Sequence, residues 1–316
     1  MMPECRRALL IHGGALGDFV LTLTVVAGLR GAGIERITLL ARGGIRPLAE
    51  LVDGVDRILD LDTAGGHALF SEEASLPALL MAQLHDCDLA VDLMAGKDSP
   101  LGRRLRQAGV ARVVHVDPRP RPKPVGHITA QWLADLRGVG VAGRPVPPRL
   151  PLPAAEMAAA RQELAGRLSA GSGPIAILHP GSGGRAKCWP LPSFVEAAGR
   201  LAAQGVKAGF LLGPVESELL TPSELGALRA AGPTWENRTL RQAAALLAAS
   251  DVVVGNDSGT SHLAAAVGAR VVTIFGPTDP VVWRPLGAGV KVLHRPGPDS
   301  WPEVGEVVEA VVSSLS

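Results

Sequence analysis

The sequence contains no tyrosine, and aromatic residues make up only 3% of it. Proteins that bind single-stranded nucleic acid use aromatic side chains as platforms on which bases stack. Positive and negative charges are nearly balanced, with 31 lysine and arginine residues against 30 aspartate and glutamate residues. Because the net charge is only +1, no strong field attracts a polyanion. The composition therefore argues against a nucleic-acid-binding protein.

Cysteine is scarce as well, and Cys5, Cys87 and Cys188 lie far apart in the chain. This spacing forms neither a disulfide framework nor a metal-binding motif, and it favours a reducing cytoplasm. The apolar stretch near the N-terminus resembles a signal peptide, but His12 and Asp18 interrupt it. No uninterrupted apolar run has the length of a membrane span. We therefore expect a cytoplasmic protein without a transmembrane helix.

The 316 residues are 47% apolar and 19% charged, which is typical of a globular chain of one large or two ordinary domains. Short apolar runs alternate with helix-compatible segments. Strands are predicted at 8–11, 37–40, 57–61, 89–93, 113–116, 175–178, 252–254 and 270–275. Helices are predicted at 19–29, 47–52, 76–85, 100–108, 128–137, 154–168 and 260–267. The alternation predicts an α/β protein with parallel, doubly wound sheets.

A proline-rich segment, 143–153, divides this series into two halves. Its composition predicts a stiff, extended linker between an N-terminal domain, 1–150, and a C-terminal domain, 151–316. Ligands in such sheets bind at the carboxyl ends of the strands, so the two domains are expected to face each other across a cleft. The last helix has an apolar face that includes Val307 and Val311. We expect this face to be buried, with the N-terminal domain as a candidate partner.

Three capping boxes predict where helices begin in the second half. In such a box a hydroxyl caps the N-terminus of the helix, and a longer side chain returns a hydrogen bond. The boxes pair Ser193 with Glu196, Thr239 with Gln242, and Ser300 with Glu303.

The most informative stretch is 250–280, S-D-V-V-V-G-N-D-S-G-T-S-H-L-A-A-A-V-G-A-R-V-V-T-I-F-G-P-T-D-P. Its β-branched run predicts a buried strand, and G-N-D-S-G predicts a turn that begins a helix. The free N–H groups of such a helix N-terminus suit a phosphate or another anion. An ordinary, well-capped βαβ unit is the alternative, but more polar groups gather here than capping needs. They are Asp257, Ser258, Thr260, Ser261, His262, Thr278 and Asp279.

A second polar stretch, 179–190, reads H-P-G-S-G-G-R-A-K-C-W-P and follows the predicted strand 175–178. Its glycines allow the backbone to approach a ligand closely. Arg185 and Lys187 bring positive charge, and charged hydrogen bonds to a diphosphate stabilise binding by about 1.5–3 kcal/mol each. A solvated basic loop is the alternative. We expect His179 to be a structural hydrogen-bonding residue and Cys188 to fill space.

A third polar group, Asp18, follows the glycine-rich turn H-G-G-A-L-G after the first predicted strand. The glycine spacing is not G-x-G-x-x-G, so the turn lacks the dinucleotide-binding fingerprint. A carboxylate at the start of a helix stabilises the helix dipole by about 0.3–1 kcal/mol. At the ligand-binding end of a strand, a carboxylate is also suited to act as a general base toward a substrate hydroxyl. Both interpretations fit the sequence.

Together these three stretches resemble glycosyltransferase family 9, the ADP-heptose:lipopolysaccharide heptosyltransferases. The matching motifs are G-A-L-G-D-F-V-L-T-L, H-P-G-S…K-C-W-P, and G-N-D-S-G-T-S-H-L-A-A-A-V-G followed by F-G-P-T-D-P. Their order and spacing agree from Ala8 to about Pro285. The resemblance implies a GT-B fold, in which two doubly wound Rossmann-like domains face each other across a cleft. Thr24 and Cys188 depart from the family pattern, and they leave the identity of the sugar open.

Residue by residue, the resemblance implies that Asp18 is the catalytic base and that Lys187 meets the phosphates of the donor. Asp257, Ser258 and Gly259 are expected to hold the donor's sugar and diphosphate. The other expected donor-binding residues are Ser182, Arg185, Thr260, His262, Thr278 and Asp279. No cofactor and no metal ion are expected, because the sequence shows no carboxylate pair with an obvious metal-binding role. Protein groups would then stabilise the departing diphosphate.

The implied reaction is an inverting transfer of a sugar to a hydroxyl of a lipopolysaccharide-core-type acceptor, with ADP-heptose as the favoured donor. The C-terminal domain is expected to bind the donor and the N-terminal domain the acceptor. Basic residues are enriched between 103 and 123, where Asp117 is the one acid. Arg119, Arg121 and Lys123 are expected to bind an anionic, lipid-linked saccharide and to contact the inner face of the cytoplasmic membrane peripherally. A solvated basic loop is again the alternative.

Two other functions stay open on the sequence. A nucleotide-sugar 2-epimerase has a similar fold and needs acids and bases around one sugar, without an acceptor. A non-catalytic nucleotide-sugar-binding protein is the second alternative, and the presence of both Asp18 and Lys187 argues against it. The presence of Asp18 together with the third motif favours transfer.

Overall fold

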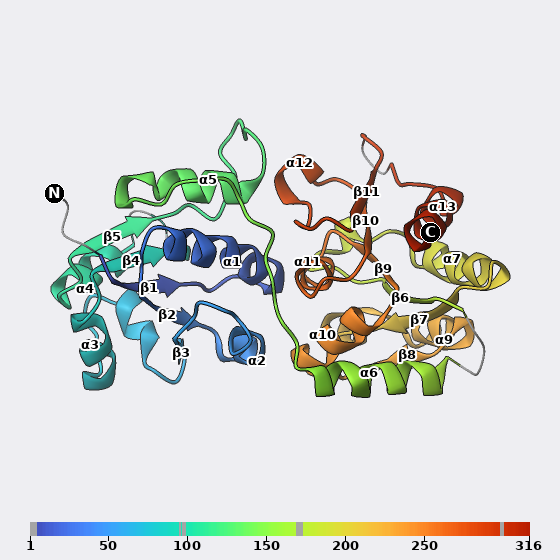
Figure 1. Ribbon diagram of the computed structural model, residues 1–316, viewed down its shortest axis with the longest axis horizontal. Coiled ribbons are helices and arrows are strands. Elements are labelled where there is room, and N and C mark those ends of the chain that lie inside the picture. The colour runs from blue at the N-terminus through green and yellow to red at the C-terminus, as the bar shows by residue number, and fades with distance from the viewer. Residues whose placement is uncertain (1–4, 95, 97–98, 169–172, 298–299) are drawn as a thin grey trace. The chain divides into compact units, whose positions relative to one another are not determined.

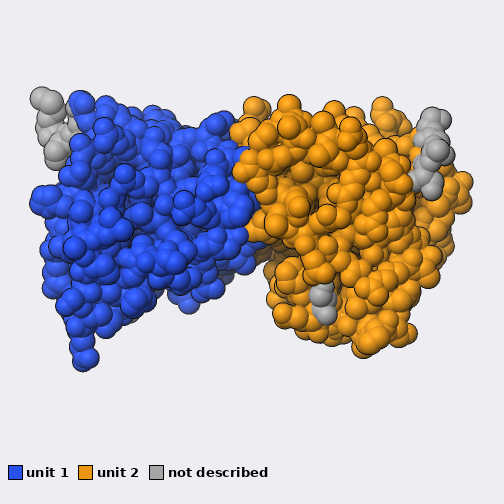
Figure 2. Space-filling view, turned by 90° about the horizontal axis from the view of Figure 1, so that it is seen from below, with its two compact units in different colours: residues 1–146 blue, residues 147–316 orange. Residues whose placement is uncertain are grey.

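The computed structural model describes residues 5–94, 96, 99–168, 173–297 and 300–316. The chain divides into two compact units, Met1–Val146 and Pro147–Ser316 (Figure 2). Each unit is a parallel sheet with helices packed on it (Figure 1). The predicted fold class, two doubly wound α/β sheets, is therefore confirmed. The boundary between the units lies within the predicted linker, 143–153. Leu150, in this linker, donates its N–H to the carbonyl of Ala266 in the second unit (2.9 Å).

The first unit has a five-stranded sheet in the order β3-β2-β1-β4-β5. Its strands are β1 (Arg7–Ile11), β2 (Arg36–Ala41), β3 (Arg57–Asp60), β4 (Leu89–Asp92) and β5 (Arg112–His115). Its helices are α1 (Leu16–Gly31), α2 (Arg46–Ala49), α3 (Ala78–His85), α4 (Leu101–Gln107) and α5 (Ile128–Asp135), with 3-10 turns η1 (Gly43–Ile45), η2 (Gly66–Phe70) and η3 (Arg137–Val139). The strand order reverses between β1 and β4, which is where open α/β sheets bind ligands.

The second unit has a six-stranded sheet in the order β11-β10-β9-β6-β7-β8. Its strands are β6 (Ile175–His179), β7 (Lys207–Leu211), β8 (Thr234–Trp235), β9 (Val252–Asn256), β10 (Val271–Phe275) and β11 (Val290–His294). Its helices are α6 (Ala154–Arg167), α7 (Leu191–Ala203), α8 (Pro214–Leu219), α9 (Pro222–Ala231), α10 (Leu240–Ala249), α11 (Gly259–Ala266), α12 (Pro280–Trp283) and α13 (Val304–Leu315), with the 3-10 turn η4 (Arg185–Lys187). Here the order reverses between β9 and β6, so the ligand-binding crevice is expected at the ends of these two strands.

Helices cover both faces of the second sheet. The helices α7, α9 and α13 pack together on one face, and α6, α10 and α11 pack together on the other (Figure 1). Phe194 of α7 and Phe210 of β7 are fully buried in the core between the sheet and the first group. The sequence predicts a buried apolar face on α13, with the first half of the chain as a candidate partner. Its buried valines, such as Val307 and Val311, lie instead in the core of the second unit.

Of the three helices α7, α10 and α13, for which a capping box is predicted, α10 begins at its predicted box. Thr239 and Gln242 cap each other's backbone N–H groups and begin α10 as predicted. The helix α7 begins earlier than the Ser193 box predicts, because Pro192 fits the first turn, where its missing N–H needs no partner. The helix α13 begins later, after Glu303, whose N–H donates to Glu306 (2.7 Å).

No helix in the described ranges combines the length and the apolar character that crossing a membrane requires.

Candidate functional site

The second and third sequence stretches follow β6 and β9, the two strands at which the order of the second sheet reverses. The two strands are hydrogen-bonded neighbours, and His179 pairs in register with Gly255. Because parallel strands end at the same edge, the loop 180–190 and the turn 256–259 lie side by side there. Residues about 75 positions apart in sequence, such as Ser182 and Asp257, therefore come together.

Asn256, at the end of β9, connects this turn to the loop 180–190. Its side chain is fully buried and uses both of its polar atoms. The Oδ1 atom accepts the N–H of Trp189 (2.9 Å), and Nδ2 donates to the carbonyls of Pro180 (2.8 Å) and Gly181 (3.3 Å). One amide side chain thus holds both ends of the loop that contains Lys187.

Lys187 meets Asp257 across the edge of the sheet. Its ammonium donates to Oδ2 of Asp257 (2.9 Å), and the hydroxyl of Thr278 donates to the same oxygen (2.7 Å). The Asp257 side chain is 6% exposed and that of Lys187 is 39% exposed. The lysine therefore stays accessible to a ligand, while the carboxylate is held beneath it. Ser182 is buried here too, and its hydroxyl donates to the carbonyl of Asp257 (2.6 Å).

The helix α11 begins at this point and directs its N-terminus at the same edge. Ser258 is the N-cap, and its hydroxyl accepts the N–H of Ser261 (3.4 Å). Gly259 is the first helical residue, and Thr260 is hydrogen-bonded through Oγ1 to Nε2 of His179 (3.0 Å). The positive end of the helix dipole and the Lys187 ammonium therefore meet at one place, which suits an anion such as a diphosphate.

The remaining residues predicted to bind the donor differ in their surroundings. His262 is buried within α11. Arg185 lies on η4, and its guanidinium donates to the carbonyl of Leu219 (3.2 Å). Asp279 is exposed, and its carboxylate caps α12 by accepting the N–H of Val281 (2.8 Å). The structure thus gives Asp279 a helix-capping role, while Lys187, Asp257 and Thr278 form one cluster.

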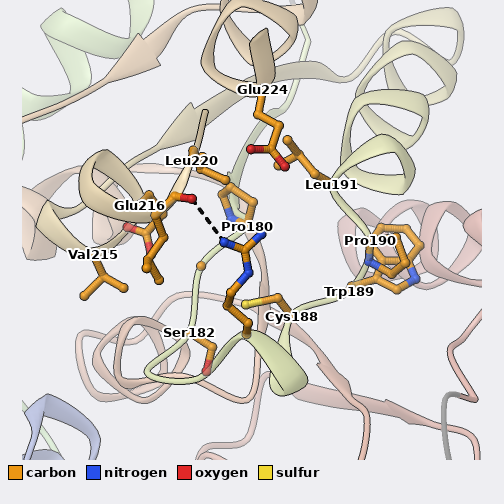
Figure 3. A pocket seen from close by; sticks show the side chains of 13 residues that line it. Pro180, Ser182, Cys188, Trp189, Pro190, Leu191, Val215, Glu216, Leu220 and Glu224 are labelled. Carbon is orange, nitrogen blue, oxygen red and sulfur yellow. Dashed lines mark hydrogen bonds between the residues drawn. The ribbon is translucent and has the colours of Figure 1, made fainter. Parts of the chain in front are cut away.

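A cavity of about 190 Å³ opens between the loop 180–191 and the helices α8 and α9 (Figure 3). Ligand pockets of drug size measure about 300–1,000 Å³, so this cavity can hold only part of a nucleotide-sugar. Glu216 lines it, and one of its oxygens accepts the N–H of Gly213 (2.6 Å). A Cβ on Gly181 would lie 1.4 Å from the other oxygen, so only glycine leaves room for this carboxylate. Burial raises the pKa of the neighbouring Cys188 thiol, in keeping with a residue that fills space.

In the first unit, Asp18 lies in the first turn of α1, just after β1. Its carboxylate accepts the N–H of Ala15 (3.2 Å), so the predicted helix-capping role is present. His12 is adjacent: a Cβ on Gly14 would meet Oδ2 of Asp18 at 2.7 Å and Cε1 of His12 at 3.0 Å. Burial lowers the pKa of His12 to about 4, against hydrogen bonds with the Ala15 and Gly14 backbone that raise it. The imidazole of His12 is therefore neutral at pH 7 and places no positive charge beside Asp18.

The basic residues predicted to bind the acceptor lie on the loop between β5 and α5. Arg119 pairs with Asp117 (3.3 Å), and Arg121 pairs with Asp135. Burial alone would raise the pKa of Asp117, but hydrogen bonds from the Arg119 backbone and side chain lower it. Lys123 is exposed on the same loop. Part of the positive charge of the loop is thus already balanced by carboxylates.

Sequence reasoning missed several polar residues at these edges. Asn256 and Glu216 were not among the predicted site residues, because their partners are distant in sequence. Asp92 and His115, in register on β4 and β5, form a pair at the ligand-binding edge of the first sheet, in which Asp92 is buried and His115 is partly exposed (Nδ1 to Oδ2, 3.1 Å). An acidic or amide residue that ends a buried apolar strand is the signal that could have pointed to Asn256 and Asp92. Within the described ranges, no three His, Cys, Asp or Glu side chains gather as a metal site requires.

The sequence model of the family described as "Glycosyltransferase family 9 (heptosyltransferase)" matches residues 114–304. Lipopolysaccharide heptosyltransferase 2 of Salmonella typhimurium is 32% identical over 127 residues, which are 38% of this chain and 36% of that protein. The chain thus aligns with about a third of the length of this curated relative.

Solved structures resemble the chain over nearly its whole length. The glycosyl transferase family 9 protein of Veillonella parvula has a TM-score of 0.80 at 16% identity, covering 100% of this chain and 98% of that one. The E. coli ADP-heptose lps heptosyltransferase II has a TM-score of 0.74 at 19% identity, covering 98% of both chains. The fold is therefore GT-B, as in these two structures.

Replacing Asn256 by aspartate tests its role as the connection between β9 and the loop 180–190. The shape is kept, but a carboxylate oxygen would face the carbonyls of Pro180 and Gly181 in a buried place. We expect Asn256→Asp to lower the free energy of unfolding by about 3 kcal/mol or more. Urea denaturation followed by tryptophan fluorescence measures this, because the buried Trp189 is bound directly by Asn256.

The matched control is Asn237→Asp, an exposed asparagine in the same unit. We expect it to change the free energy of unfolding by less than about 0.5 kcal/mol. Equal and small effects of the two substitutions would contradict the role given to Asn256.

Proposed function

Because the chain belongs to glycosyltransferase family 9, we propose that it transfers heptose from ADP-heptose to a hydroxyl of a lipopolysaccharide-core-type acceptor. The E. coli structure is named for ADP-heptose, and the Salmonella relative is named for lipopolysaccharide. The observation that carries the proposal is the cluster of Lys187, Asp257 and Thr278 beside the N-terminus of α11. This cluster suits the diphosphate of a nucleotide-sugar.

The diphosphate is bound at this edge by two kinds of donor. The Lys187 ammonium is partly exposed and is held in place by Asp257. The free N–H groups at the start of α11 supply uncharged donors and the positive end of the helix dipole. Charged hydrogen bonds of this kind are worth about 1.5–3 kcal/mol each. In this proposal the second unit binds the donor and the first unit binds the acceptor.

Transfer proceeds by a single displacement at the anomeric carbon. Asp18 accepts the proton of the acceptor hydroxyl as its oxygen bonds to the anomeric carbon, which inverts the configuration there. The bond from this carbon to the diphosphate oxygen breaks, and ADP leaves with the electron pair. Lys187, together with Arg185 and the N-terminus of α11, stabilises the negative charge that develops on ADP. These groups do the work for which other transferases use a metal ion.

On the acceptor side, the loop between β5 and α5 combines basic and apolar groups. Lys123 is exposed, and Val125, two residues later, is 96% exposed. Exposed lysine and arginine side chains contribute about 1 kcal/mol each near an anionic membrane surface. The loop is therefore proposed to contact an anionic, lipid-linked acceptor at the inner face of the cytoplasmic membrane, peripherally and reversibly.

Asp18→Asn tests the general base. The amide oxygen can still accept the N–H of Ala15, so folding and donor binding should be kept. Turnover should fall by about two orders of magnitude or more, because the proton acceptor is lost. Sugar transfer from ADP-heptose to truncated lipopolysaccharide, with the product analysed by NMR, measures the rate and the anomeric configuration. Asp53→Asn, which changes an exposed carboxylate in the same unit, is the control and should keep full turnover. Near-normal turnover of Asp18→Asn would remove Asp18 from the mechanism.

Lys187→Ala tests the phosphate contact. The dissociation constant of ADP should rise about ten- to hundred-fold, the equivalent of one charged hydrogen bond of about 1.5–3 kcal/mol. Isothermal titration calorimetry provides the measurement. The control is Lys291→Ala on β11, a surface lysine hydrogen-bonded to Ser313, which should leave ADP affinity unchanged. Unchanged affinity of the Lys187 variant would move the diphosphate away from the cluster.

Neutralising Arg119, Arg121 and Lys123 together tests the membrane-facing loop. The wild-type protein should sediment weakly with anionic vesicles at low salt, and the binding should fall as salt screens the charges. The triple variant should lose most of this binding while it keeps its affinity for ADP. No vesicle binding by the wild type at low salt, or binding that the triple variant retains, would exclude the loop from acceptor docking.

A further inference from the structure

Thr260 differs from the other polar groups at the start of α11 because its hydrogen bond runs to a histidine. Its Oγ1 lies 3.0 Å from Nε2 of His179, and Nδ1 of that ring lies 2.9 Å from the carbonyl of Leu211. His179 is buried, at 5% exposed, whereas Thr260 is half-buried on the ligand-binding edge. A chain of hydrogen bonds therefore runs from the end of β7, through a buried ring at the end of β6, to the hydroxyl of the half-buried Thr260.

The direction of these hydrogen bonds follows from what each atom can do. A carbonyl oxygen only accepts, so Nδ1 of His179 carries a proton and donates it to Leu211. In the neutral ring, Nε2 then has a lone pair and no proton. With Nε2 unprotonated, the hydroxyl of Thr260 donates its single proton to Nε2, and its oxygen has only lone pairs left for a ligand. Oε1 of Glu216, 3.9 Å from Nε2, is the nearby carboxylate.

A hydroxyl that can only accept selects its partner. The oxygens of a diphosphate are acceptors at neutral pH, so they gain nothing from Thr260 Oγ1. The hydroxyls of a carbohydrate can donate. We infer that Thr260, oriented by His179, accepts a hydrogen bond from a carbohydrate hydroxyl of the bound nucleotide-sugar, either on the ribose or on the transferred sugar. This inference rests on the proposed function, since it concerns the same ligand.

The edge is thereby divided into two parts. Lys187 and the N–H groups at the start of α11 are donors, and they suit the diphosphate. Thr260 offers only an acceptor and so suits a hydroxyl. A site that hydrogen-bonds a hydroxyl discriminates strongly against ligands that lack it, because the polar group is then left unpaired. His179 is the positioning residue of this arrangement, and Thr260 is the residue that touches the ligand.

The test uses substitutions of Thr260 and three ligands. Thr260→Val keeps the shape and removes the hydroxyl, whereas Thr260→Ser keeps the hydroxyl. The ligands are inorganic pyrophosphate, which has no hydroxyl of a sugar, ADP, which adds the ribose, and ADP-heptose, which adds the transferred sugar. Dissociation constants are measured for each pair by calorimetry at pH 8.

We expect Thr260→Val to leave pyrophosphate affinity within about two-fold and to weaken ADP-heptose about ten-fold, as the loss of one neutral hydrogen bond predicts. Thr260→Ser should bind ADP-heptose nearly as the wild type does. A loss already present with ADP assigns the hydroxyl to the ribose, and a loss seen only with ADP-heptose assigns it to the transferred sugar.

The role of His179 is tested by ligand selectivity. If His179 acts through Thr260, adding His179→Asn to Thr260→Val should leave the ratio of the ADP-heptose and pyrophosphate affinities as it is in Thr260→Val alone. His179→Asn alone should weaken ADP-heptose more than pyrophosphate, whereas a purely structural role of His179 would weaken both ligands equally. Equal weakening of all three ligands by Thr260→Val, or no weakening of any, would overturn the inference while leaving the proposed function in place. A wild-type protein that binds neither ADP nor ADP-heptose would instead overturn the proposed function, and the inference with it.

Discussion

The ligand-binding edge of the second unit depends on one buried amide, the side chain of Asn256. It hydrogen-bonds the backbone at both ends of the loop 180–190 from the end of β9. Within the loop the local backbone forms the 3-10 turn η4, and Asn256 fixes how that turn is placed against β9. In this placement, Lys187 reaches Asp257 from a different strand. The geometry of the site thus comes from a polar contact inside the fold rather than from the loop itself.

The hydrogen bonds of Asn256 lie at the point of the doubly wound sheet where ligands usually bind. The strand order reverses between β9 and β6, and the chain leaves these neighbouring strands toward opposite faces. The resulting crevice exposes backbone N–H groups of α11 and room for a ligand. The charged cluster, the cavity beside Glu216 and the His179–Thr260 hydrogen bond all lie at or just after the carboxyl ends of β6, β7, β9 and β10. Hydrogen-bond donors and a hydrogen-bond acceptor therefore lie at different places along one edge, as a ligand with both phosphates and hydroxyls requires.

Much of the fold could be predicted from local sequence, because local groups determine it. The turn and helix that follow β9 were predicted to within one residue at the helix start, since Ser258 caps it. Contacts between distant residues could not be predicted. Asn256 binds partners 67 and 76 positions away, and Glu216 occupies space that Gly181 leaves. The start of α13 was misjudged because Ser300–Glu303 and Glu303–Glu306 both have the spacing of a capping box, and the second one forms.

A crystal structure of the protein with ADP-heptose tests the central claim most directly, namely that the edge formed by β6 and β9 binds the diphosphate of a nucleotide-sugar. The account predicts diphosphate oxygens within hydrogen-bonding distance of the Lys187 ammonium and of the backbone N–H groups at the start of α11. It also predicts that the loop 180–190 keeps its contacts with Asn256 when the ligand is bound. A diphosphate bound away from the ends of β6 and β9 would contradict the account.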